Sequence, residues 1–202
     1  ICELLSKGQH TANALVLYDA ESDWIAGGMP MQKVSRQLLE SQIDFDFVPM
    51  DYLEDLAAYN GKAEGDKLII NGITFDALII PYIRAIPEHF AKWISENPQF
   101  PIMFVDAYPG SVIGTEGTDI EAVKAASGVV ALENVAAWRK EKGFFEISID
   151  QFFPALSTYH YVKDGNIYAI QNESADKTFK GTITLPSAAE LIVYNGLTDT
   201  YE

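Results

Sequence analysis

The stretch ALVLYDAESDWIAGG, residues 14–28, decides the fold class. Its first residues form a short apolar run that ends beside a carboxylate, as expected for a strand buried on both faces. Comparable runs recur at 77–81, 102–105 and 129–130, while 43–48 alternates apolar and polar residues. Segments with helical periodicity separate these strands, so residues 1–150 are predicted to form an α/β domain with helices on both faces of a parallel sheet.

The predicted helices cover residues 29–41, 52–59, 88–96, 118–126 and 134–141. Pro30 suits the first turn of the first helix, because the missing N–H of proline has no helical partner there. Asn71 and Gly72 separate two apolar runs, and an Asn-Gly pair favours a hairpin turn because both residues tolerate positive φ.

The pattern changes near residue 150. Two alternating strands flank the Asp164-Gly165 pair, a third is expected within 179–186, and a fourth, with another Asn-Gly turn, within 190–202. Strands without intervening helices predict an antiparallel sheet. A β-sandwich usually takes about 100 residues, so we expect a partial β-sandwich segment, cut short, at 151–202.

Composition limits the classes of partner. The chain has 202 residues, 48% of them hydrophobic, and a formal net charge of -15. Such an acidic chain would repel phosphate backbones and anionic membrane surfaces, so neither nucleic acid nor membrane is expected as a partner. Cys2 is the sole cysteine, which excludes an intramolecular disulfide and a cysteine-based zinc site.

Carboxylates gather after the first strand, at Asp19, Glu21 and Asp23, and Trp24 follows them. Two carboxylates about 5 to 9.5 Å apart across a glycosidic bond could act as acid and base. An acidic loop can equally be a solvated turn or a lip that touches a ligand. Trp24 could stack on a sugar or fill a core or interface site.

The remaining motifs exclude several chemistries. Asp106, Glu116, Asp119 and Glu121 follow one strand, but their spacing fits no EF-hand loop, so no metal is expected. The sequence lacks both GxGxxG and GxxxxGK[ST], so no nucleotide cofactor is expected. No cofactor of any other kind is expected either.

The turn FVDAYPG, residues 104–110, stands where glutamine-amidotransferase-like domains carry their nucleophile, yet it contains neither Cys nor Ser. The three histidines, His10, His89 and His160, are scattered along the chain. A nucleophile–base–acid triad is therefore not expected.

Four segments taken together resemble a known family: ALVLYDAESDW (14–24), QLLESQIDFDFVPMDYL (37–53), DALIIPYIRAIP (76–87) and FVDAYP (104–109). They are similar to the flavodoxin-like accessory domain of large bacterial glycoside hydrolases of the α-L-rhamnosidase-like family. More distantly, they resemble the trimerisation domain of β-galactosidases. The resemblance covers roughly residues 10–185.

The resemblance implies that a catalytic (β/α)₈ barrel precedes this region in the parent chain and holds the catalytic carboxylates. No catalytic residue is therefore assigned here. It also implies a periplasmic or extracellular location, with the barrel, a carbohydrate and a second copy of the chain as candidate partners.

Ligands of parallel α/β sheets bind at the carboxyl ends of the strands. We therefore expect Glu21, Asp23, Trp24, Asp106 and Tyr108 to form a cleft or interdomain lip. Two alternatives remain open: a self-contained hydrolase that uses the acids at this edge, and a flavodoxin-like ligand-binding domain.

Overall fold

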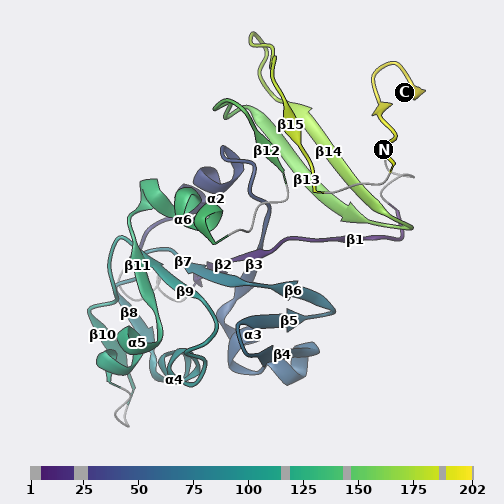
Figure 1. Cartoon of the computed structure of the whole chain (residues 1–202). Helices are drawn as coiled ribbons and strands as arrows, with labels where there is room; N and C mark the ends of the chain where they lie inside the picture. Colours follow the sequence, from purple (N-terminus) through teal and green to yellow (C-terminus); the bar gives the residue numbers. More distant parts are fainter. Residues whose placement is uncertain (1–5, 21–26, 115–118, 143–146, 187–189, 202) are drawn as a thin grey trace.

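A five-stranded parallel sheet forms the centre of the protein (Figure 1). The computed structural model describes residues 6–20, 27–114, 119–142, 147–186 and 190–201. The sheet strands are β2 (Ala14–Tyr18), β3 (Phe45–Pro49), β7 (Ala77–Ile80), β9 (Ile102–Val105) and β11 (Gly128–Val130). Their spatial order is β3-β2-β7-β9-β11, which is 2-1-3-4-5 when the strands are numbered in order of appearance. The predicted mixed α/β fold with a parallel sheet is confirmed.

Helices cover both faces of this sheet (Figure 1). One face carries α2 (Met31–Leu39) and α6 (Val135–Glu141), and the other carries α4 (Glu88–Glu96) and α5 (Ile120–Ala126). The described residues also form short helical pieces: α3 (Met50–Glu54), η1 (Leu56–Tyr59) and η2 (Leu132–Asn134). Among the described residues, no helix reaches the length and apolar character that crossing a membrane requires.

The side chains of β2 show why the strand is apolar throughout. Val16 faces the core cluster that contains Val34 and Leu38 of α2. Leu17, on the opposite face, belongs to the cluster that contains Phe90 of α4. Because side chains alternate across a strand, each face of β2 contributes to a separate core. Full burial of each large side chain is worth about 1.5–3 kcal/mol.

Two helix predictions need correction. The helix expected at 52–59 is divided into α3 and η1, because Asp55 leaves the helical region with φ -133°. Its carboxylate instead accepts a hydrogen bond from the Ala58 N–H. Pro30 lies just before α2 as its N-cap, with extended ψ of 126°, and is not a residue of the first turn.

Two small sheets extend the α/β body. An antiparallel meander consists of β4 (Gly61–Glu64), β5 (Lys67–Ile70) and β6 (Ile73–Phe75). Asn71 and Gly72 connect the last two strands with φ of 50° and 82°, which confirms the predicted hairpin turn. Beyond the sheet, β8 (Ala85–Pro87) pairs in parallel with β10 (Ser111–Ile113), which the sequence did not indicate.

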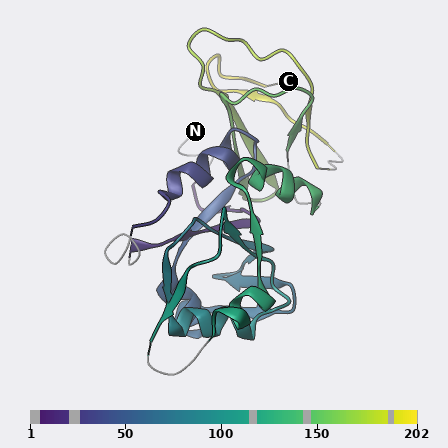
Figure 2. The same cartoon turned by 90° about the vertical axis from the view of Figure 1, so that its left-hand side faces the viewer.

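The C-terminal part is antiparallel, as predicted. The hairpin β13 (Leu156–Val162) and β14 (Asn166–Asn172) takes β1 (Gln9–His10) as a third strand beside β13. Shorter pairs join β12 (Ser148–Ile149) to β15 (Ile183–Thr184) and β16 (Tyr194–Asn195) to β17 (Thr200–Tyr201). The strands expected within 179–186 and 190–202 are thus only two-residue pieces. Figures 1 and 2 place β13 and β14 beyond α2 and α6, away from α4 and α5.

Candidate functional site

The predicted site lies at the carboxyl ends of the parallel strands. Glu21, Asp23 and Trp24 fall outside the described residues, whereas Asp106 and Tyr108 follow β9 directly. Tyr18 ends β2 and is 44% exposed at this edge. The sheet order reverses between β2 and β7, and such a switch point is where doubly wound sheets usually bind ligands.

Backbone pairing crosses this switch point. Gly28 and Ile83 form an isolated antiparallel bridge, and the Met29 N–H donates to the Tyr82 carbonyl at 2.7 Å. A Cβ on Gly28 would lie 2.8 Å from the Tyr82 carbonyl oxygen, closer than real contacts allow. The segment after β2 is therefore held against the segment after β7.

Asp106 has an unusual backbone conformation. Its φ is 68°, and the Ala107 N–H donates to the Val105 carbonyl across it at 2.9 Å, which makes a tight γ-turn. Its carboxylate Oδ1 accepts from the Leu132 N–H at 2.8 Å, and its own N–H donates to Val130. Asp106 thus ties the end of β9 to the turn after β11.

Tyr108 packs rather than projects. It is half-buried, its ring lies 5.5 Å from the Phe104 ring, and its hydroxyl donates to the Ser127 carbonyl at 3.0 Å. These contacts fix the loop after β9 against the end of α5. Within the described part of the chain, no three or more His, Cys, Asp or Glu side chains are arranged to hold a metal ion.

A second polar region lies at the opposite edge, where the strands begin. His10 of β1 contacts two carboxylates: its Nε2 lies 2.9 Å from Asp44 Oδ2 and its Nδ1 lies 3.0 Å from Asp46 Oδ1. Its ring stacks on Tyr159 with the centroids 4.3 Å apart. Burial opposes the charged form, but the hydrogen bonds and charges of Asp44 and Asp46 outweigh it and raise the pKa of His10 to about 9.

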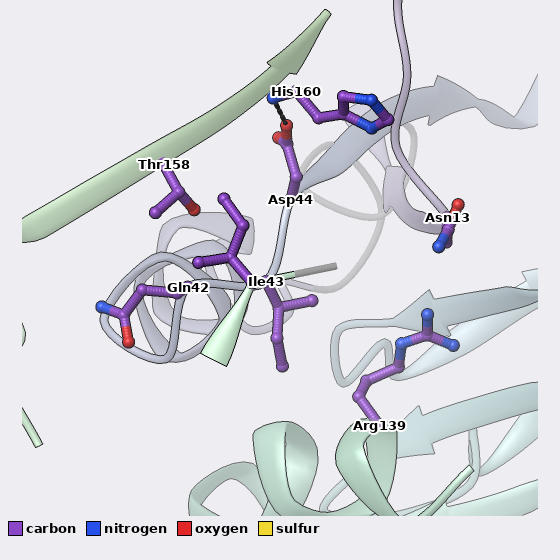
Figure 3. A pocket seen from close by; sticks show the side chains of 8 residues that line it. Asn13, Gln42, Ile43, Asp44, Arg139, Thr158 and His160 are labelled. Atoms are coloured by element: carbon purple, nitrogen blue, oxygen red, sulfur yellow. Dashed lines mark hydrogen bonds between the residues drawn. The ribbon is translucent and has the colours of Figure 1, made fainter. Parts of the chain in front are cut away.

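His160 of β13 continues this network. Its Nδ1 lies 2.9 Å from Thr11 Oγ1 and its Nε2 lies 3.0 Å from Asn166 Oδ1. Its backbone N–H donates to Asp44 Oδ2 at 3.1 Å (Figure 3). Asp44 therefore contacts both His10 and β13, and joins the parallel sheet to the C-terminal sheet.

A small cavity lies beside Asp44 at the same junction. Figure 3 shows side chains that line it from both parts of the chain, including Gln42, Arg139, Thr158 and His160. Its volume is about 20 Å³, which is enough for about one water molecule. Sites for small-molecule ligands are typically about 300–1,000 Å³. The cavity is therefore too small for a sugar ring.

Arg139, which helps to line the cavity, belongs to a buried ion pair. Arg139 Nη1 of α6 lies 2.5 Å from Asp76 Oδ1, and the two side chains are 1% and 3% exposed. Burial raises the pKa of Asp76, although the hydrogen bond and charge of Arg139 oppose the rise. The pair fastens α6 to the segment that enters β7.

Sequence reasoning missed the junction because His10, Asp44 and His160 are far apart along the chain. One signal was available in the segment IDFDF, residues 43–47. Its alternation places Asp44 and Asp46 on one side of a strand. Two carboxylates on the same side of a strand at the edge of the sheet predict a cationic partner.

No protein-family model and no curated protein sequence matches the chain. Among solved structures, a rhamnosidase from Novosphingobium sp. PP1Y is similar with a TM-score of 0.55 at 10% identity. The match covers 84% of this chain and 18% of the rhamnosidase. The apo exo-carrageenase GH42 from Bacteroides ovatus has a TM-score of 0.53 at 16% identity, covering 91% of this chain and 25% of that enzyme.

Both neighbours are glycoside hydrolases, and the chain spans about a fifth to a quarter of their lengths. At identities this low, the structural similarity shows a common fold and gives no information on a common activity. The GH42 β-galactosidase Gan42B aligns with a TM-score of only 0.34, which supports no conclusion.

Proposed function

We propose that this chain is a non-catalytic accessory region of a glycoside hydrolase, which docks on the catalytic barrel of the same parent protein and shapes its cleft. One observation carries the proposal. The fold matches 84% and 91% of this chain, but only 18% and 25% of two glycoside hydrolases. A region that makes up so small a part of such enzymes need not contain their catalytic carboxylates.

The proposal divides the chain into a flavodoxin-like or amidotransferase-like α/β body at residues 1–150 and a partial β-sandwich segment at 151–202. The strand order 2-1-3-4-5 supports the first assignment, because flavodoxin-like sheets have this order. The antiparallel hairpin β13–β14 supports the second. Pairing of β1 with β13 connects the two parts.

In this proposal the loop with Glu21, Asp23 and Trp24 is a lip that faces the barrel. The bridge between Gly28 and Ile83 favours this role over a flavodoxin-like ligand site, because backbone occupies the switch point. Asp106 and Tyr108 support the neighbouring loop. A carbohydrate and a second copy of the chain are the additional partners proposed for this edge.

An activity assay tests the proposal. The isolated 202-residue chain should not hydrolyse a panel of nitrophenyl glycosides, including the rhamnoside and the galactoside, since in this proposal the carboxylate pair that flanks the glycosidic bond belongs to the barrel. A barrel-containing glycoside hydrolase serves as the positive control. Turnover that disappears in Asp19→Asn or Glu21→Gln would contradict the proposal and favour a self-contained hydrolase.

A further inference from the structure

His10 connects the two sheets of the protein. Its backbone belongs to β1, which pairs with β13, and its ring reaches carboxylates at the start of β3 in the parallel sheet. The His10 side chain is 20% exposed, and those of Asp44 and Asp46 are 16% and 33% exposed. The contacts are therefore partly shielded from water, and solvent screens them less than an exposed surface pair.

The geometry specifies the protonation state of the ring. An ionised carboxylate can only accept hydrogen bonds, and a neutral imidazole has a single N–H to donate. Both ring nitrogens of His10 lie within 3.0 Å of a carboxylate oxygen. The imidazolium form alone satisfies both contacts. The Tyr159 ring, stacked at 4.3 Å, adds a π-face that favours the cation.

We propose that His10 is a pH-sensitive latch, which as an imidazolium holds the β1–β13–β14 sheet against the amino edge of the parallel sheet and releases it on losing a proton. Deprotonation leaves one carboxylate facing a ring nitrogen that can no longer donate. The contact through Asp44 extends the effect to β13, because the same Oδ2 accepts the His160 N–H.

The groups that face His10 favour its protonated form. Asp44 and Asp46 face it from the start of β3, and Tyr159, with Tyr161 beyond it, faces it from β13. Burial and the two carboxylates raise the pKa of the Tyr159 hydroxyl above its ordinary value of 10.0, so this group stays neutral while His10 titrates. His160 contacts the network through Thr11 and Asp44.

The direction of the pH dependence follows from the pKa of His10, which is 6.5 in the unfolded chain and is raised to about 9 in the folded one. The folded state binds the extra proton between these values. Stabilisation by the latch is therefore complete below pH 6.5 and is lost as the pH rises through about 9. The resulting increase in the unfolding constant is at most about tenfold per pH unit.

Nuclear magnetic resonance of the full 202-residue chain tests the protonation state. With ¹⁵N-labelled histidine, both ring nitrogens of His10 should carry protons at pH 7.5 and titrate near pH 9. Asp46→Asn, which removes the carboxylate that contacts His10 Nδ1 at 3.0 Å, should lower that midpoint by about one unit or more. A neutral ring titrating near pH 6.5 would overturn the proposal.

Unfolding by denaturant between pH 6 and 10 tests the latch itself. His10→Gln should remove the part of the pH dependence that lies between 6.5 and 9. His89→Gln is the matched control, because His89 also contacts a carboxylate, Glu54, but lies on α4 away from the junction.

Amide exchange of Thr11 and His160 should accelerate through pH 9 in the unmodified chain. If His10→Gln does not fold, Asp46→Asn replaces it in the same comparison. The latch would be contradicted if the free energy of unfolding of the variant kept the same pH dependence. It would also be contradicted if amide exchange accelerated with pH only as much as the intrinsic exchange rate does.

Discussion

Gly28 has a structural role that follows from its missing side chain. The bridge to Ile83 brings its Cα so close to Tyr82 that a Cβ would meet a backbone carbonyl oxygen at 2.8 Å. A backbone atom cannot move aside as a flexible side chain can. The close approach thus depends on glycine, and it holds the segment after β2 across the switch point.

Gly28→Ala should destabilise the protein by about 1–3 kcal/mol, the usual cost of overpacking a fixed site. Equilibrium denaturation measures the loss. Gly110→Ala is the matched control, because the nearest atom to its Cβ would be the Arg84 carbonyl oxygen at an ordinary 3.6 Å. Equal effects of the two substitutions would show that the bridge does not constrain this edge.

The Arg139–Asp76 pair gives a second test at single side chains. Both partners are almost fully buried, so removing one leaves a charge without its counterion. Arg139→Met should cost about 3–5 kcal/mol. The double variant Arg139→Met/Asp76→Leu should recover much of that loss, because a buried pair can often be replaced by apolar residues.

A double-mutant cycle on thermal or denaturant melts measures this coupling. Lys124→Ala is the control, since its pair with Glu121 lies on an exposed helix face and should contribute little to the free energy of unfolding. Additive effects of the two buried substitutions would mean that the pair is not coupled in solution.

The central strands could be predicted because their apolar sequences reflect burial on both faces of the sheet. Runs such as Ala14–Leu17 and Ala77–Ile80 are apolar throughout, and two-sided burial needs that pattern. By contrast, β1, β8 and β10 have only two or three residues, too few to show a period. Their pairing depends on neighbours brought close by the fold, which no local pattern records.

The candidate site divides in the same way. Sequence position placed Asp106 and Tyr108 at the carboxyl edge, and the structure has both there. It did not indicate that Asp106 caps Leu132 or that Tyr108 is anchored on Ser127. The residues in these two contacts are 26 and 19 positions apart along the chain, respectively. The lip role of these residues stays a prediction.

The β5–β6 hairpin shows what local sequence can specify fully. Gly72 has φ of 82°, a conformation that costs other residues energy. Gly72→Ala should destabilise the protein by about 1 kcal/mol, whereas Asn71→Gly should be nearly neutral because glycine accepts positive φ. Denaturant melts of both variants compare them. Equal stability of Gly72→Ala and the unmodified chain would mean that the turn relaxes elsewhere.

The two edges of the parallel sheet have different roles in this structure. The carboxyl edge carries loops held by backbone bridges and caps, while the amino edge meets the C-terminal sheet through charged and buried polar groups. Gln42 strengthens that junction, because its side-chain amide donates to the carbonyls of Phe153 and Leu156. These contacts and the β1–β13 pairing cross the boundary proposed near residue 150.

Limited proteolysis tests that boundary. Domain linkers are exposed, and few contacts cross the boundary at which they lie. If the chain has two parts, a protease should therefore cut first between residues 143 and 157. Pairing of Gln9 with Val162 and of His10 with Tyr161 should then keep the nicked fragments together. They should elute as one species in native size-exclusion chromatography and separate only in denaturant.

Two results would argue against this division, each in its own way. Resistance to cleavage together with a single unfolding transition would mean that the C-terminal segment belongs to one cooperative domain. Fragments that separate without denaturant would mean that β1 and Gln42 contribute little to holding the parts together. The matched variant is His10→Gln: its nicked fragments should dissociate at a lower denaturant concentration than those of His89→Gln, because it lacks the contacts to Asp44 and Asp46 that anchor β1 on the parallel sheet.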